Sequence, residues 1–186
     1  MQLFTGGDAT SYSSGFPSRL IYNMTYPTGP YTRLIPEMNF ACNGNVTGYT
    51  VALRNQALLG DGQDPIILVW RKNTSQLGSY YKINPGIAID SALCVGGLTE
   101  EFSGVFHCNL NQTRASVAVK AGDILGFAGI NGDIAFARAS RGPTNYVFNT
   151  SKSQLSMYSR TLLRPGIREL PQITLEIGSG KIYKLL

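Results

Sequence analysis

Short apolar segments, each followed closely by a turn signal, recur along most of this sequence and constrain its fold more than any other feature. Tyr49, Val51 and Leu53 alternate with smaller or polar residues, the period-two pattern of a half-buried strand. Residues 65–71 form an apolar run that begins with Pro65, as expected of a central strand. Similar strand signals occur at 79–83, 117–119, 124–127, 134–136 and 173–177. Because helical periodicity is almost absent, and 21 Gly and 9 Pro supply the turns, we expect an all-β fold.

The number and spacing of these strands predict a two-sheet antiparallel sandwich, either jelly-roll-like or immunoglobulin-like. We favour the jelly roll, because the Cys…Trp…Cys spacing of a true immunoglobulin domain is not present. The sandwich is expected over residues 31–178. Residues 1–30 are expected to form a loosely ordered arm or at most an edge strand, and 179–186 a C-terminal tail.

The three cysteines match no zinc site, because there is no Cys-x-x-Cys and His107 is the single histidine. Cys94 and Cys108 flank thirteen residues rich in Gly, so we predict a disulfide between them. Cys42 is then left over, either buried as a small apolar residue or paired outside this chain. A disulfide between Cys42 and Cys108 is the alternative.

Five Asn-x-Ser/Thr sequons indicate a glycoprotein, since none has Pro in the middle and this number exceeds chance for the composition. Each sequon falls where a turn or loop is expected, as glycosylation requires. The candidate acceptors are Asn23, Asn45, Asn73, Asn111 and Asn149.

The compartment is inferred from these sequons and cysteines. No segment approaches the 18 apolar residues of a membrane span, so we expect no direct membrane insertion. The first residues have neither a basic start nor an apolar stretch, so no signal peptide is visible. We expect the chain to be one module of a longer secreted or membrane-anchored protein, lying outside the cell.

The net charge of +5 comes partly from few acidic residues, and no clustered basic face with stacking aromatics points to nucleic acid. Basic residues recur only towards the C-terminus, at Lys152, Arg160, Arg164 and Arg168. They form either an ordinary solvated surface or a patch for anionic glycans or an acidic partner.

Catalytic and metal-binding motifs are weak. His107 is adjacent to Cys108 in a predicted strand, so their side chains point to opposite faces, and no Gly-x-Ser-x-Gly elbow is present. We therefore predict a non-enzymatic protein without a cofactor. Asp61 and Asp64 flank Gly62 like a fragment of a calcium loop, but the remaining ligands are missing and a plain turn is favoured. Asp123 is expected to cap the turn at Gly122.

Tyrosines near turns are the best hint of a binding surface, because exposed Tyr stacks on sugars and hydrogen-bonds to protein partners. The candidates are Tyr22, Tyr26, Tyr31, Tyr80, Tyr81 and Tyr146. The competing interpretation is that most of them line the sandwich. Trp70 lies in the most apolar strand and is assigned to the core.

Several motifs occur in a characteristic order: Cys42-Asn43-Gly44, the 65–71 strand, Val119-x-x-Gly122-Asp123-Ile124-Leu125-Gly126, Gly142-Pro143-Thr144-Asn145-Tyr146 and Leu170-Pro171-Gln172-Ile173-Thr174-Leu175. In this order, over roughly residues 31–178, the chain resembles an uncharacterised family of extracellular β-sandwich modules from early-branching animals. The resemblance implies a recognition or adhesion module that binds an extracellular protein or glycan. A carbohydrate-binding, lectin-like module is the alternative.

Overall fold

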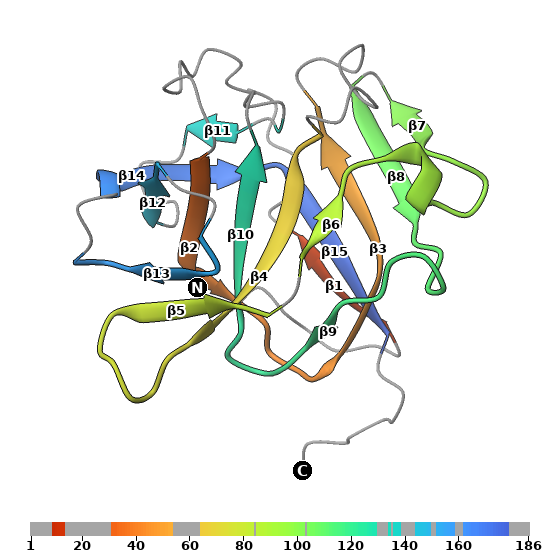
Figure 1. Cartoon of the computed structure of the whole chain (residues 1–186). Helices are drawn as coiled ribbons and strands as arrows, with labels where there is room; N and C mark the ends of the chain where they lie inside the picture. Colours follow the sequence, from red (N-terminus) through yellow and green to blue (C-terminus); the bar gives the residue numbers. More distant parts are fainter. Residues whose placement is uncertain are drawn as a thin grey trace.

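The structure is a computed structural model that describes residues 9–13, 31–53, 64–83, 85–102, 104–129, 134, 136–138, 144–149, 152–158 and 162–178. Two antiparallel sheets pack against each other (Figure 1). The prediction of an all-β, two-sheet antiparallel sandwich is therefore confirmed. Within the described part of the chain, no helix has the length and apolar character needed to cross a membrane.

In the described part of the chain, the smaller sheet has six strands. Their order is β1 (Ala9–Ser13), β15 (Ile173–Gly178), β3 (Gly44–Ala52), β8 (Val105–Asn109) and β7 (Thr99–Phe102), and β9 (Ala118–Val119) also pairs with β3. β1 lies at the edge, next to β15. The remainder of the predicted N-terminal arm and the 179–186 tail lie outside the described residues.

The larger sheet has nine strands among the residues that the structure covers. Their order is β11 (Phe136–Arg138), β14 (Leu162–Pro171), β12 (Thr144–Phe148), β2 (Tyr31–Asn39), β10 (Ile124–Gly129), β4 (Ile66–Lys72), β5 (Ser79–Lys82) and β13 (Gln154–Ser156), and β6 (Ile87–Ala88) also pairs with β4. A short 3₁₀ helix, η2 (Ser91–Leu93), follows β6. β4 has a neighbour on each side, as predicted for a central strand.

The middle strands of the larger sheet are buried on both faces. Val69 of β4 and Leu125 of β10 belong to the main core between the sheets. Their neighbours Trp70 and Ile124 belong to a second apolar cluster. Because alternate residues of a strand point to opposite faces, this cluster lies on the outer face of the sheet. This double burial explains why β4 is a continuous apolar run rather than an alternating one.

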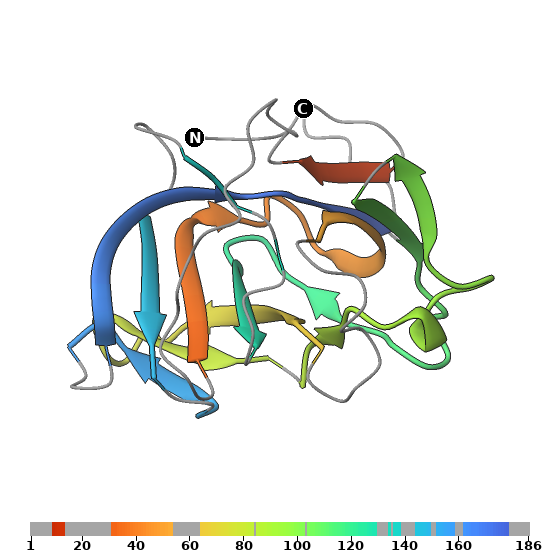
Figure 2. The same ribbon diagram turned by 90° about the horizontal axis from the view of Figure 1, so that it is seen from above.

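The larger sheet covers its own outer cluster by curling. The outer cluster contains Phe148 of β12 and Leu155 of β13, which lie on opposite sides of the central strands β10 and β4, and Met157 and Leu162 pack against it. Figure 2 shows the curl, with β13 and β14 approaching each other at one side. The β5–β13 end is thereby carried away from the smaller sheet.

Candidate functional site

The turn between β4 and β5 projects from the lower left of the molecule in Figure 1. Backbone hydrogen bonds close it: Asn73 N donates to Ser79 O at 2.8 Å, and Ser79 N donates to Gln76 O at 3.1 Å. The Asn73 side-chain oxygen accepts from Ser75 N at 3.0 Å. These bonds hold the turn in a defined shape, which a binding loop requires.

The segment after β13 packs against this turn. Met157 N donates to Gly78 O at 2.9 Å, and Gln154 Nε2 donates to Gln76 Oε1 at 3.4 Å. The Tyr158 ring lies against Gly78, where an added Cβ would come within 2.8 Å of Tyr158 Cε2. Since Gly78 also has φ of +70°, a residue with a side chain is disfavoured there on two counts.

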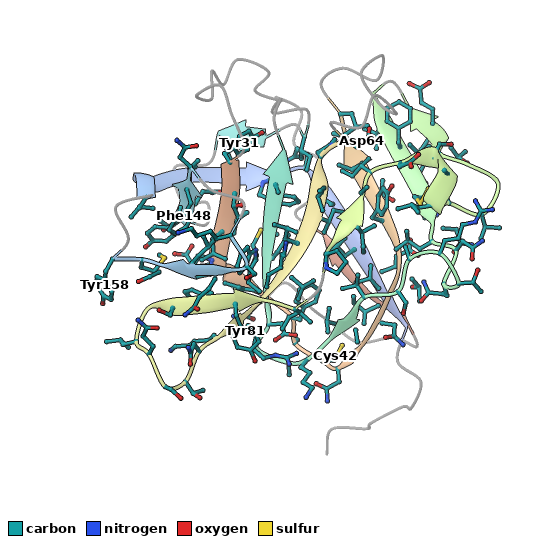
Figure 3. All side chains as sticks on the ribbon, viewed as in Figure 1. Tyr31, Cys42, Asp64, Tyr81, Phe148 and Tyr158 are labelled. Atoms are coloured by element: carbon teal, nitrogen blue, oxygen red, sulfur yellow. A yellow bond between two sulfur atoms is a disulfide. The ribbon has the colours of Figure 1, made fainter. Side chains whose placement is uncertain are left out.

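The combined surface exposes two large apolar side chains, Leu77 next to Gly78 in the chain and Tyr158 with its ring against Gly78. Leu77 is 75% exposed and Tyr158 is 76% exposed, the highest values for large apolar residues in the described part of the chain. We call Gln76, Leu77, Gly78, Gln154 and Tyr158 the hairpin patch. Figure 3 shows Tyr158 at the left edge of the molecule, with Tyr81 closer to its centre.

Tyr158 was not among the tyrosines selected from the sequence. Of the four selected tyrosines that the structure describes, Tyr31 is buried, Tyr80 and Tyr146 are half-buried and Tyr81, at 41%, is exposed. Burial raises the pKa of Tyr80, and Tyr146 adds to that effect. Tyr22 and Tyr26 lie outside the described residues. No local signal distinguishes Tyr158, because its exposure depends on the curl of the sheet.

The charged residues around the hairpin patch are basic. Lys72 is exposed at the start of the turn, and Lys82 is half-buried at the end of β5. Lys72 is opposite Tyr80, and Tyr80 and Lys82 are two residues apart on one strand. Both lysines therefore lie on the same face of the sheet. Diagonal neighbours of this kind are about 7 to 8 Å apart, within the reach of one extended ligand.

Arg71, in contrast, forms a structural ion pair with Asp123. Its Nε and Nη2 donate to Asp123 Oδ1 and Oδ2 at 2.6 and 2.7 Å, and the Asp123 side chain is 1% exposed. Hydrogen bonding to this carboxylate raises the pKa of Arg71. Asp123 Oδ2 also accepts from Lys120 N at 2.8 Å, which confirms the predicted turn cap. The sequence did not indicate Arg71 as its partner, because the two residues are far apart in the chain.

Cys94 and Cys108 form a disulfide, as predicted. The alternative pairing of Cys42 with Cys108 is therefore wrong. Cys42 takes no part in a disulfide and packs, partly buried, against the main core. Val95, beside the disulfide, is 59% exposed.

His107 does not form a catalytic relay with its described neighbours. Its Nδ1 is 3.1 Å from Thr50 Oγ1 and 3.8 Å from Glu176 Oε1. A nucleophile–base–acid relay needs the hydroxyl and the carboxylate on opposite ring nitrogens, whereas both groups lie at the same one here. Cys108 points to the other face and is held in the disulfide, so it supplies no thiolate to this histidine.

The sequons occupy different kinds of structure. Asn73 and Asn111 lie in turns, and Asn149 is exposed directly after β12. The expectation that every sequon lies in a turn or loop is wrong for Asn45, which is exposed but lies within β3, opposite Ala118 and Gly178. The strand includes this residue because the side chains of Val46, Tyr49 and Val51 are buried in the main core and hold this segment in the sheet. Asn23 lies outside the described residues.

The remaining predicted sites are only partly described. Lys152 is exposed before β13, whereas Arg164 and Arg168 lie in β14 without described side chains and Arg160 lies outside the described residues. Asp64 is half-buried before β4, and Asp61 is not described. No group of three or more His, Cys, Asp or Glu side chains that could hold a metal occurs in the ranges that the structure covers.

Comparisons with family models, with curated proteins and with solved structures found no match to this chain.

Proposed function

We propose that this chain is a non-enzymatic extracellular recognition or adhesion module, forming one unit of a larger secreted or membrane-anchored protein. The observation that carries this proposal is the hairpin patch, where Leu77 and Tyr158 are exposed on a turn held by hydrogen bonds. Exposed aromatic and aliphatic side chains on an ordered loop are typical of recognition surfaces.

The extracellular location is supported by the disulfide between Cys94 and Cys108, since disulfides persist in oxidising compartments. The Asn111 sequon adds to this support. Thr113 N and Oγ1 donate to Asn111 Oδ1 at 3.1 and 2.6 Å. The hydroxyl that the acceptor motif requires thus lies against the amide that would carry the glycan.

The location is tested by secreting the full chain from eukaryotic cells with an added signal peptide and measuring its intact mass. We expect glycan mass, removable by glycosidase, at two or more sequons, and one internal disulfide. Asn111→Gln should remove one glycan. Asn109 is exposed but lies outside any sequon, so Asn109→Gln should leave the glycan mass unchanged. A bare polypeptide with three free thiols would contradict an extracellular location.

The recognition function is tested by binding of the secreted, fluorescently labelled chain to animal cell surfaces. Replacing Leu77 and Tyr158 together by Ser should weaken binding at least tenfold, because both side chains are exposed at the patch. Val95→Ser is the matched control, since it removes an exposed apolar side chain beside the disulfide. Equal losses in the two variants would show that the hairpin patch has no special part in binding.

A carbohydrate-binding, lectin-like module is the second candidate. It is favoured by the Tyr158 ring together with the amides of Gln76 and Gln154, because sugars are bound by aromatic faces and by amide hydrogen bonds. A glycan array that shows no signal for plant, animal and bacterial sugars would remove this candidate.

A further inference from the structure

The two chain segments that build the projecting arm carry charge of one sign. Residues 71–83 and 152–158 contain Arg71, Lys72, Lys82 and Lys152 and no acidic residue. Arg71 is neutralised by Asp123, but Lys72 and Lys82 lie on one face of the arm and give it a positive potential. Such a surface attracts anions and is complementary to a polyanion.

The neighbouring groups suit sugar rings. The Tyr158 ring packs only partly on Gly78 and leaves most of its surface in solvent, while Gln76 and Gln154 offer amide groups. Gln154 lies opposite Tyr81, so its amide is on the other face of the arm from Lys72 and Lys82. A neutral sugar would leave both lysines unused, whereas a chain of sugars that carries sulfate or carboxylate groups would use the lysines as well as the ring.

An acidic protein partner fits the arm less well. A stable protein interface buries roughly 800 Å² on each side around an apolar centre. The apolar part of the hairpin patch is limited to Leu77 and Tyr158. A narrow projecting arm with separated lysines is better suited to an extended chain than to a broad interface.

We infer that an acidic polysaccharide binds along the arm formed by β5 and β13, with Lys72 and Lys82 contacting its sulfate or carboxylate groups and Tyr158 contacting a sugar ring. This inference rests on the proposed recognition function and specifies its ligand class. Because the contacts are charge-assisted and solvent-exposed, binding should weaken as salt is raised.

The test measures binding of the secreted full chain to heparin, hyaluronan, dextran sulfate and neutral dextran by surface plasmon resonance at several salt concentrations. We expect binding to the anionic polymers and none to neutral dextran. Changing Lys72 and Lys82 together to Gln should weaken binding at least tenfold. The matched control changes Arg114 and Lys120, two exposed basic residues outside both segments of the arm, to Gln and removes the same charge; its affinity should stay within twofold.

Tyr158→Ala should weaken binding of a short sulfated oligosaccharide about tenfold while leaving its salt dependence unchanged, because it removes stacking and no charge. Equal losses in the two double variants would overturn the inference, since binding would then depend only on net charge. Polyglutamate that binds as tightly as heparin, with the same dependence on Lys72, Lys82 and Tyr158, would assign the arm to an acidic protein instead. Cell binding by the wild-type chain without any binding to acidic polysaccharide would overturn this inference and leave the recognition function standing.

Discussion

Tyr49 shows, at the scale of single residues, how the main core controls an ionisable group. Its side chain is fully buried between the sheets, and its hydroxyl is 3.9 Å from Cys94 Sγ. Burial raises the pKa of this phenol well above its ordinary value of 10, and the nearby charge of Asp90 raises it further. The folded protein therefore holds Tyr49 neutral at pH values where the unfolded chain ionises it.

This shift predicts a loss of stability at alkaline pH. Because the folded pKa lies above the unfolded one, the contribution of Tyr49 is fully present below pH 10 and declines above it. We expect the free energy of unfolding to fall by about 1 kcal/mol per pH unit above 10 from this group. Urea unfolding of wild type and Tyr49→Phe between pH 8 and 11 measures it. The variant should show a smaller alkaline decline; an identical decline would contradict the assignment to Tyr49.

At the scale of elements, the packing of β4 against β10 depends on a close approach at Gly126. A Cβ at this position would lie 2.7 Å from Trp70 Nε1 and 2.6 Å from the Arg33 carbonyl oxygen. The indole of Trp70, which is fully buried in the outer cluster, therefore occupies the space that a side chain would take. Glycine is required here for space alone.

We expect Gly126→Ala to lower the free energy of unfolding by about 1 to 3 kcal/mol, the usual cost of overpacking a core. Gly129→Ala is the control in the same strand, because its Cβ would meet nothing closer than 3.5 Å. Its stability should change by less than about 1 kcal/mol. Thermal unfolding followed by circular dichroism compares the two variants, and similar melting temperatures would show that Trp70 moves aside without cost.

The elements that could be predicted from the sequence are those whose signal is local. The 65–71 run gave β4, and the alternation of Ile173, Leu175 and Ile177 gave β15 with the correct buried face. β14 was missed because Pro165 and Gly166 interrupt its strand pattern, although the strand continues through both. Its pairing with β11 and β12 depends on contacts distant in the chain, which local patterns do not contain.

The candidate site was predicted less well than the fold, for a related reason. A turn or loop at the Asn73 sequon was expected, but Tyr158 becomes part of the hairpin patch only because β13 pairs with β5. That pairing in turn depends on the curl of the larger sheet over Leu155. The exposure of a side chain depends on how the whole sheet is assembled. The residue types near turns therefore predicted the exposed Tyr81 but not the exposed Tyr158.

At the scale of the whole molecule, the disulfide links Cys94, which directly follows η2, to Cys108 of β8 across a separation of 14 residues. A loop of this length should contribute about 3 kcal/mol by restricting the unfolded chain. We expect a reducing agent to lower the free energy of unfolding by about this amount, measured by urea unfolding. Changing Cys94 and Cys108 together to Ala should remove the sensitivity to reduction, and Cys42→Ala should retain it. A wild-type chain equally stable in both conditions would contradict this contribution.

The passage of β14 into β15 across Gln172 makes one run of backbone part of both sheets. β15 lies between β1 and β3, with hydrogen bonds to each. Ala9 pairs with Gly178, so the start of β1 and the end of β15 lie at the same end of their ladder. A pull applied to the chain at Ala9 and at Gly178 would therefore open the β1–β15 ladder one pair at a time from that end, while β15 stays held by its ladder with β3. For a module linked in series within a tethered protein, this geometry would let β1 peel away under tension before the rest of the smaller sheet is loaded.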